Sequence, residues 1–495
     1  EVIRLMVRLL LAGDPDKLAK PGIILKVYDP CAGSGGMLTA AKDEITALNP
    51  EAEVLLYGQE VNPETYAVCK ADMLMKSPDG RDAENIKFGS TLSDDRLSHE
   101  RFDYLLSNPP YGKDWRRDKG AVEKEARRGG RFSAGTPRIS DGQLLFLQHM
   151  LSRMNPPAQD GGRVAIVMNG SPLFTGDAGS GESQIRRWIL ENDWLECIVA
   201  LPDQLFYNTG INTYVWVLSN RKEPRRQGKV QLIDATDFYR KMRKSLGDKR
   251  HELGEEHIRT IVDLYTACEE GEHSRIFDRE EFGYRKIRVE RPLRLNFQAT
   301  PARIERLKEQ RAFQNLARSR RRDPEKRAQE EAEGREQQQA ILNMLAGMLP
   351  TLYKDKAEFR QVLKRAARQH GITLHASMRK AIYAALGEKD EMAEVARDGK
   401  GRPEPDTDRR DYENVPLKKD IWEYFEREVR PYVPDAWVDE DYRDEKDGQV
   451  GRVGYEINFN RHFYQYQPPR PLEEIEADIA ALEREILAML GEVAG

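Results

Sequence analysis

The sequence has few cysteines and no long apolar run, and both absences exclude classes of protein. The four cysteines among 495 residues are scattered, with no C-x-x-C pair and no histidine at ligand spacing. A disulfide framework and a structural metal site are therefore not expected. No run of 18 apolar residues occurs, because Arg4 and Arg8 interrupt the best candidate, and no secretory signal pattern is present. We expect a cytoplasmic protein without a membrane segment.

The chain also lacks an overall excess of positive charge. Its formal net charge is −5, although 33% of its residues are charged. Any affinity for nucleic acid must therefore come from a local basic patch.

Apolar runs alternate with helix-like stretches over the first 235 residues. This alternation is typical of a doubly wound α/β sheet with buried parallel strands. The expected strands are residues 25–28, 54–57, 103–106, 163–168, 197–201 and 213–218, with one more short strand within 85–92. The expected helices are residues 37–47, 63–75, 142–153 and 182–192.

The composition changes near residue 300. Residues 301–411 are charged and favour helices, with a second helical stretch at 355–395 and a Pro/Gly-rich linker at 399–411. We divide the chain accordingly into residues 1–300, 301–411 and 412–495. The last part ends in a heptad-like run, which predicts an amphipathic helix that either packs on its own domain or binds a partner. Its apolar residues are Leu472, Ile475, Ile479, Leu482, Ile486, Met489 and Val493.

A glycine-rich turn follows the first expected strand, in KVYDPCAGSGGMLTAA (26–41). Glycines allow a ligand close to the backbone, and a helix N-terminus favours a carboxylate or phosphate. No Lys-Ser/Thr pair follows the glycines, and Leu38 stands where a G-x-G-x-x-G fingerprint needs glycine. What remains is a small ligand with an acidic or zwitterionic end, or a tight turn without a ligand.

Glu60 ends the second expected strand, where it can accept hydrogen bonds from both hydroxyls of a ribose. Together with Asp29 in the glycine turn, it suggests a nucleoside that carries an amino acid. S-adenosyl-L-methionine is such a molecule.

The third expected strand stops at Asn108-Pro109-Pro110-Tyr111, in FDYLLSNPPYG (102–112). The side-chain carbonyl of Asn108 and the backbone carbonyl of Pro109 can each accept one N–H of an adenine amine, which frees its lone pair to attack a sulfonium methyl group. Consecutive prolines have a fixed φ and no N–H, so they offer no competing donor. Tyr111 can stack on a base that has left the duplex. No general base is needed, because water can take the proton later.

Four segments, in order, resemble the modification (M) subunit of type I restriction–modification systems: DPCAGSGGML, YGQEVNPETYAVCKADMLM, FDYLLSNPPYG and DGQLLFLQHML. The resemblance covers about residues 1–300 and 412–495. That family consists of S-adenosylmethionine-dependent adenine-N6 DNA methyltransferases. It implies a Rossmann-like methyltransferase sheet with a C-terminal helical extension, and site-specific methylation of a flipped adenine in double-stranded DNA, within a restriction or related phage-defence complex.

The resemblance also implies partners and site residues. A specificity (S) subunit would read the DNA, two M subunits would flank it, and a restriction (R) subunit would cut and translocate. The family has a helical domain before the helix EVIRLMVRLL, so we expect a fragment. The implied catalytic residues are Asn108, Pro109, Pro110 and Tyr111. The implied cofactor contacts are Asp29, Pro30, Cys31, Ala32, Gly33, Ser34, Gly35, Gly36 and Glu60, with Ser90 where related enzymes carry Asp or Asn.

Two basic segments are candidates for DNA contact. Residues 112–140 contain nine Lys/Arg against four Asp/Glu, which predicts a flexible loop along the phosphates or an ordinary solvated loop. Residues 239–250 form a second basic run. The expected phosphate contacts are Lys113, Arg116, Arg117, Arg127, Arg128 and Arg131.

Two other functions stay open. A protein glutamine methyltransferase must also activate an amide nitrogen and carries Asn-Pro-Pro-Tyr, although such enzymes are compact and lack the long segment after this tetrad. A scaffold that binds the cofactor without methylating would not need the intact tetrad.

Overall fold

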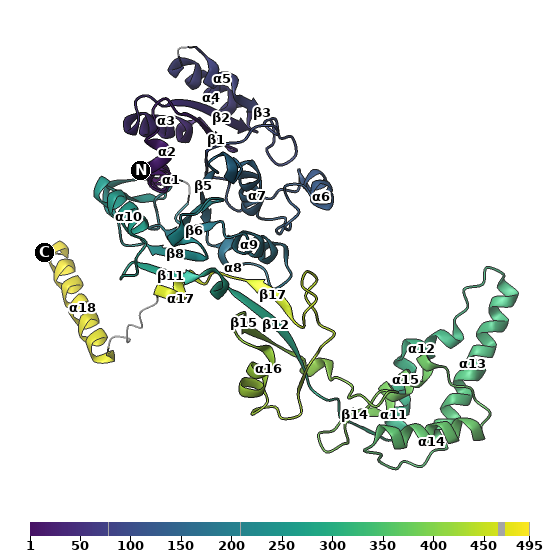
Figure 1. Ribbon diagram of the computed structural model, residues 1–495. Coiled ribbons are helices and arrows are strands. Elements are labelled where there is room, and N and C mark those ends of the chain that lie inside the picture. The colour runs from purple at the N-terminus through teal and green to yellow at the C-terminus, as the bar shows by residue number, and fades with distance from the viewer. Residues whose placement is uncertain (78, 208, 464–470, 495) are drawn as a thin grey trace. The chain divides into compact units, whose positions relative to one another are not determined.

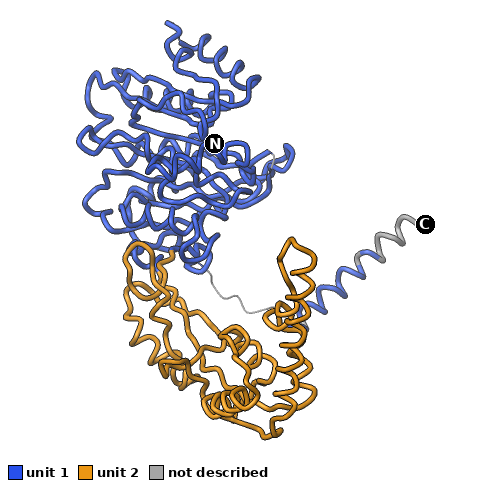
Figure 2. Tube along the Cα trace, turned by 90° about the vertical axis from the view of Figure 1, so that its right-hand side faces the viewer, with its two compact units in different colours: residues 1–283, 455–495 blue, residues 284–454 orange. Residues whose placement is uncertain are grey.

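The computed structural model describes all residues except 78, 208, 464–470 and 495, and it leaves aside the side chains of 473, 485 and 487–494. The chain forms two compact units, residues 1–283 with 455–495 and residues 284–454 (Figure 2). The divisions expected at residues 300 and 411 were drawn where the amino-acid composition changes. The boundaries between the two compact units lie instead after Gly283 and before Tyr455. The reason is that β12 (Gly283–Glu290) pairs with β17 (Arg452–Tyr455), so the outgoing and returning segments lie side by side.

A nine-stranded sheet in the order β11-β8-β6-β7-β5-β4-β1-β2-β3 is the centre of the first unit (Figure 1). Every expected strand is present, which confirms the doubly wound α/β class. The strands are β1 (Ile24–Asp29), β2 (Glu53–Glu60), β3 (Ile86–Phe88), β4 (Tyr104–Ser107), β5 (Arg163–Asn169), β6 (Leu195–Ala200), β7 (Thr213–Ser219), β8 (Lys229–Asp234) and β11 (Ser274–Asp278).

The expectation of a parallel strand at 213–218 is wrong. β7 lies antiparallel between β5 and β6. Parallel neighbours need a crossover, usually a helix, and the described residues between 201 and 212 form none. The sequence analysis also did not expect β8 or β11; β8 is parallel to β6, and β11 is antiparallel to β8.

Helices cover both faces of this sheet (Figure 1). On one face, α1 (Val2–Ala12), α3 (Gly36–Leu48) and α10 (Glu255–Ala267) contribute to one hydrophobic core. On the other lie α7 (Gln143–Arg153) and α9 (Gly181–Glu191). The four expected helices are confirmed as α3, α4 (Pro63–Lys76), α7 and α9.

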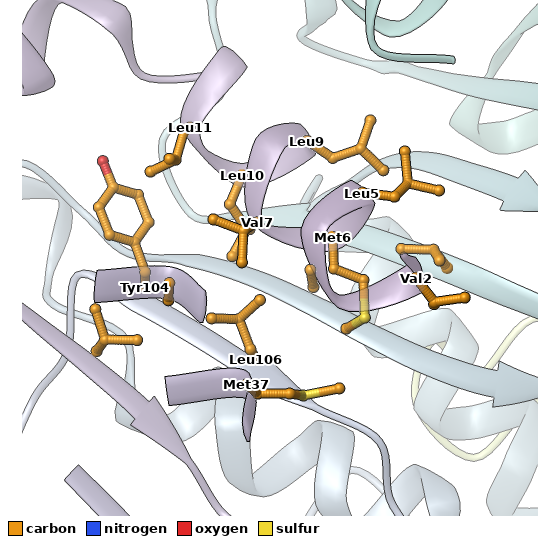
Figure 3. Close-up of a cluster of buried hydrophobic side chains, with 14 of the residues drawn as sticks. Val2, Leu5, Met6, Val7, Leu9, Leu10, Leu11, Met37, Tyr104 and Leu106 are labelled. Atoms are coloured by element: carbon orange, nitrogen blue, oxygen red, sulfur yellow. The ribbon is translucent and has the colours of Figure 1, made fainter. Parts of the chain in front are cut away.

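Helix α1 shows why these residues pack as they do. Its sequence VIRLMVRLLLA places apolar residues at helical spacing, and Leu5, Met6 and Leu9 are fully buried. They belong to the same hydrophobic core as Tyr104 and Leu106, on the strand that leads to Asn108 (Figure 3).

The second unit combines a small sheet with a helical part. β12 pairs with β15 (Asp411–Pro416), β16 (Trp437–Val438) and β17. The expected helical stretches are confirmed as α13 (Pro324–Ala346), and as the pair α14 (Lys356–Gln369) and α15 (Ala376–Leu386). The interpretation of 399–411 as a linker is wrong, because Leu293 N donates to Glu404 O at 2.8 Å and so ties this segment to the unit.

Short elements connect these parts. They are α2 (Pro15–Leu18), α5 (Arg81–Glu84), α6 (Lys119–Arg127), α8 (Ser171–Phe174), β9 (Arg240–Leu246), β10 (Lys249–Glu252), β13 (Leu295–Phe297), α11 (Pro301–Glu305), α12 (Arg311–Gln314), β14 (Gly387–Lys389), α16 (Ile421–Tyr424) and α17 (Phe459–Phe463). Among the described residues, no helix combines the length and the apolar character needed to cross a bilayer.

The expected amphipathic helix is α18 (Leu472–Ala494). Five residues of its apolar series are exposed, whereas the side chains of Met489 and Val493 lie outside the described ones. The exposed residues are Leu472, Ile475, Ile479, Leu482 and Ile486.

Leu9→Ala is expected to lower the free energy of unfolding by about 2–5 kcal/mol, because Leu9 is fully buried and its truncation leaves a cavity in the core around α1. The same change at Leu74, which is 55% exposed on α4, is expected to change it by less than about 0.5 kcal/mol. Urea unfolding of both variants measures the difference. Equal losses would contradict the placement of α1 in the core.

Candidate functional site

The order of the strands places the two sequence motifs at one edge of the sheet. From β1 the chain continues outward to β2 and β3, and then returns to β4 on the other side of β1. In such folds, ligands bind outside the carboxyl ends of the strands where this reversal occurs. β1 ends at Asp29, β2 at Glu60 and β4 at Ser107, so the glycine turn, the strand-end acid and the tetrad meet at this edge.

The Asp29 carboxylate joins the glycine turn to the strand before the tetrad. It is 1% exposed, and its Oδ1 accepts hydrogen bonds from Cys31 N at 2.8 Å and from Ser107 Oγ at 3.3 Å. Burial raises the Asp29 pKa to about 7, and the nearby Glu60 charge adds to the rise. The two hydrogen bonds act in the opposite direction and do not cancel it.

Glu60 holds the glycine turn from the neighbouring strand. Its Oε2 accepts from Gly33 N at 2.9 Å, and its Oε1 accepts from Asn62 N at 2.8 Å. Each carboxylate oxygen has a second lone pair, so both can still accept from a ligand hydroxyl.

Two glycines of the turn differ in what surrounds them. Gly35 has a φ of 84°, and a Cβ there would lie 2.5 Å from Met73 Cε, so this position needs glycine for the fold itself. A Cβ at Gly36 would meet no atom within 4 Å. Gly36 therefore borders open space at the start of α3, beside the exposed Ser34.

The remaining residues of the turn are held by neighbouring segments. Ala32 is buried and donates from its N–H to Gln59 O at 3.1 Å. Pro30 O accepts from Thr91 Oγ1 at 2.6 Å. The structure thus brings the expected turn residues 29–36 together with the end of β2.

In the tetrad, Asn108 and Pro110 are exposed, Pro109 is buried and Tyr111 is half-buried. The Tyr111 hydroxyl donates a hydrogen bond to Asn108 Oδ1. Burial raises the Tyr111 pKa, so the hydroxyl stays protonated near neutral pH. The amide carbonyl expected to receive a substrate N–H is therefore held in position by a donor that a substrate can replace.

Phe206 contacts the tetrad through Tyr111, and the sequence analysis did not single it out. Its ring meets the Tyr111 ring edge-on, with centroids 6.3 Å apart and an interplanar angle of 81°. It lies in the loop after β6, almost a hundred residues beyond Tyr111. In the sequence, Phe206 is marked only as an aromatic residue that follows an expected strand. The order of the strands in the sheet is what brings it to the site.

Asp118 is a second residue that the sequence analysis did not single out. Ser90 Oγ donates to Asp118 Oδ1 at 2.9 Å, and Ser93 shares the same carboxylate. The expected contact of Ser90 with an adenine ring stays a prediction. The two hydrogen bonds place the Asp118 carboxylate beside that position.

The basic segment 112–140 is not the flexible loop that its composition predicted. It contains α6 and a small core in which Trp115, Val122 and Phe132 pack together. Five of the expected phosphate contacts are exposed on it: Lys113, Arg116, Arg117, Arg127 and Arg128.

Arg131 does not fit the expectation of a phosphate contact. Its guanidinium turns inward, donates to Glu125 at 2.7 Å and lies 2.8 Å from His149 Nδ1. It also donates to the backbone of Thr91. Arg131 therefore fixes this segment to α7 and to the loop after β3. In the part of the chain that the structure describes, no group of three or more His, Cys, Asp or Glu residues could hold a metal ion.

The strand order and the two strand-end motifs define a Rossmann-like fold of the S-adenosylmethionine-dependent methyltransferase class. The model of the N-6 DNA methylase family matches residues 1–286, more than half of the chain, and the chain belongs to that family.

Named relatives are type I restriction enzyme methylase subunits. The MjaIX subunit of Methanocaldococcus jannaschii is 28% identical, over 53% of this chain and 44% of its own length. The HindI subunit of Haemophilus influenzae is 32% identical, over 42% of this chain and 44% of its own length. The chain thus spans less than half the length of these relatives.

A solved type I restriction-modification methyltransferase subunit from Streptococcus thermophilus is 29% identical, with a TM-score of 0.47. The alignment covers 57% of this chain and 55% of the Streptococcus thermophilus chain. At this TM-score the likeness adds nothing to the fold, which the strand order defines.

The raised pKa of Asp29 predicts a pH-dependent stability difference between the parent and Asp29→Asn. The folded state retains the Asp29 proton at pH values where the unfolded chain has lost it, so this stabilising contribution is present below pH 4 and lost as pH rises to about 7. The parent's free energy of unfolding minus that of the variant should therefore fall between pH 4 and 7 and then level off. Urea unfolding across this range measures it, and a constant difference would contradict the assignment.

Proposed function

We propose that this chain carries the catalytic part of an adenine-N6 DNA methyltransferase, the modification subunit of a type I restriction–modification or related phage-defence complex. One observation carries the proposal. The tetrad Asn108–Tyr111 follows the strand beside the glycine turn, and the Asp29–Ser107 hydrogen bond joins the two. Membership of the N-6 DNA methylase family and the names of the relatives support it.

The residues of the turn fit S-adenosyl-L-methionine. Open space borders Gly36 and the N-terminus of α3, which suits a carboxylate, and Glu60 keeps free lone pairs for ribose hydroxyls. When bound, this cofactor supplies an electrophilic methyl group on a sulfonium. The chain's own contribution is to hold donor and acceptor in line.

The tetrad's task is to prepare the adenine amine. Asn108 Oδ1, now occupied by the Tyr111 hydroxyl, accepts one N–H, and the Pro109 carbonyl accepts the other. With both N–H bonds held, the nitrogen lone pair is less delocalised into the ring. The proton released afterwards passes to water, so no side chain has to act as a base.

The rings of Tyr111 and Phe206 supply the apolar surface for the extracted base. A flipped base loses its stacking in the duplex, and aromatic side chains compensate for part of that loss. Their edge-on contact holds both rings at the same edge of the sheet as Asn108.

Two exposed surfaces support the proposed partners. The five exposed cations of segment 112–140 contact DNA phosphates, whereas Arg131 is part of the fold. The apolar series of α18 packs on the helices of a specificity subunit. A second copy of this chain and a restriction subunit complete the complex in the cytoplasm.

Gly36→Ala is expected to weaken binding of S-adenosyl-L-methionine roughly ten-fold or more, because the added methyl occupies space that the ligand needs. Stability should hold, since no protein atom lies within 4 Å of that methyl. Calorimetric titration and thermal melting measure the two effects. Gly120→Ala is the control, because it is equally open and lies on α6; if both variants bind as the parent does, the turn is not the cofactor site.

The deciding experiment is transfer of labelled methyl from S-adenosyl-L-methionine to DNA, with and without a specificity subunit. Asn108→Ala should lower the rate by roughly 10²–10³-fold, the usual effect of losing one oriented hydrogen-bonding group at a reacting centre. Cofactor affinity should stay at the parent value, because Asn108 is not part of the glycine turn.

Each other outcome identifies a different function. Label in DNA that survives Asn108→Ala would mean that the tetrad is not the active site. Label in a protein acceptor alone would indicate a glutamine methyltransferase. Cofactor binding without any transfer would indicate a scaffold.

A further inference from the structure

A basic β-hairpin extends from the same edge of the sheet as the tetrad. β8 ends there at Asp234, and the chain then forms β9 and β10, which pair antiparallel. Residues 240–252 contain six Lys/Arg against two Asp/Glu in a protein of net charge −5. Every residue of β9 except Met242 is exposed.

Hydrogen bonds fasten this hairpin to the loop that carries Phe206. Asp248 N donates to Tyr207 O at 3.1 Å, Arg250 N to Gln204 O at 2.9 Å, and Lys249 Nζ to Leu205 O at 3.1 Å. At the hairpin turn Gly247 has a φ of 62°, and a Cβ there would lie 2.4 Å from Tyr207 O. The hairpin and the loop 203–207 therefore form one unit.

Backbone strain lies at the centre of this unit. Gln204 has a φ of 54°, a conformation that costs a non-glycine residue about 1–3 kcal/mol unless its surroundings hold it. The N–H groups of Arg250 and His251 hold it by donating to its carbonyl. Such strain is concentrated at functional sites, and Gln204 lies two residues before Phe206.

A cavity of about 480 Å³ lies between the hairpin and Gln204. Its lining has two cations and no carboxylate, and within the described residues neither Lys241 nor Arg250 has an ion-pair partner. Nearby, Asp203 Oδ1 lies 3.0 Å from His251 Nδ1, and Glu256 forms an ion pair with Arg240. The lining residues are Gln204, Lys241, Met242, Ser245, Arg250 and His251.

We propose that this cavity binds a backbone phosphate of the DNA strand that carries the target adenine, and that the hairpin thereby positions Phe206 against the base. Lys241 supplies a mobile point charge and Arg250 a guanidinium fork, both suited to a phosphodiester oxygen. The inference rests on the proposed function, and it adds a DNA contact about a hundred residues beyond segment 112–140 in the sequence.

The test measures binding of the full chain to a fluorescent DNA duplex with one unpaired adenine, over a series of salt concentrations. Each phosphate contact contributes about 0.9 to the slope of log K against log salt. Because both side chains bind the same phosphate, Lys241→Gln with Arg250→Gln should reduce the steepness of that slope by roughly 0.9, with an unchanged melting temperature and cofactor affinity.

The control changes two exposed lysines at the opposite, amino edge of the sheet, Lys20→Gln with Lys229→Gln. This pair should leave the slope at the parent value. If the hairpin variant also keeps the parent's slope and affinity, the cavity is not a phosphate site, whatever the methylation assay shows. If the slope changes as expected while the parent transfers no methyl group to DNA, the phosphate site stands and the proposed catalysis fails.

Discussion

The rest of the site depends on one buried carboxylate. Asp29 ends β1 inside the sheet edge, where its Oδ1 accepts from the glycine turn through Cys31 and from β4 through Ser107. A buried charge is unfavourable unless it is hydrogen-bonded. The raised pKa of Asp29 reflects the free-energy cost of ionising this buried carboxyl group. The arrangement persists because β1 and β4 are adjacent parallel strands. It fixes the distance between the turn and Asn108.

The aromatic part of the site is held by the same edge in a different way. Tyr111 packs against the main hydrophobic core and donates to Asn108, while Phe206 approaches from the loop between β6 and the antiparallel β7. Rings supported by the core keep a fixed position without a ligand. The hairpin bonded to the Phe206 loop extends this support outward to an exposed basic surface.

Much of the fold could be predicted because strands and helices have different apolar periods. β1, β2, β4, β5 and β6 are short apolar runs, and their boundaries lie within a few residues of those expected. The direction of β7 could not be predicted, since a buried strand has the same pattern in either direction. The interpretation of 399–411 as a linker was wrong because composition does not show that the backbone of Glu404 is hydrogen-bonded to that of Leu293.

By itself, the sequence determined the chemistry at each strand end: glycines after Asp29, a carboxylate at Glu60, and two prolines between Asn108 and Tyr111. These are local properties, because each depends on a residue type and its immediate neighbours. The tertiary structure alone decided that Phe206 meets Tyr111, that Ser90 and Asp118 share a hydrogen bond, and that Arg131 points inward. Those contacts join residues distant in the chain, and only the order of the strands in space brings them together.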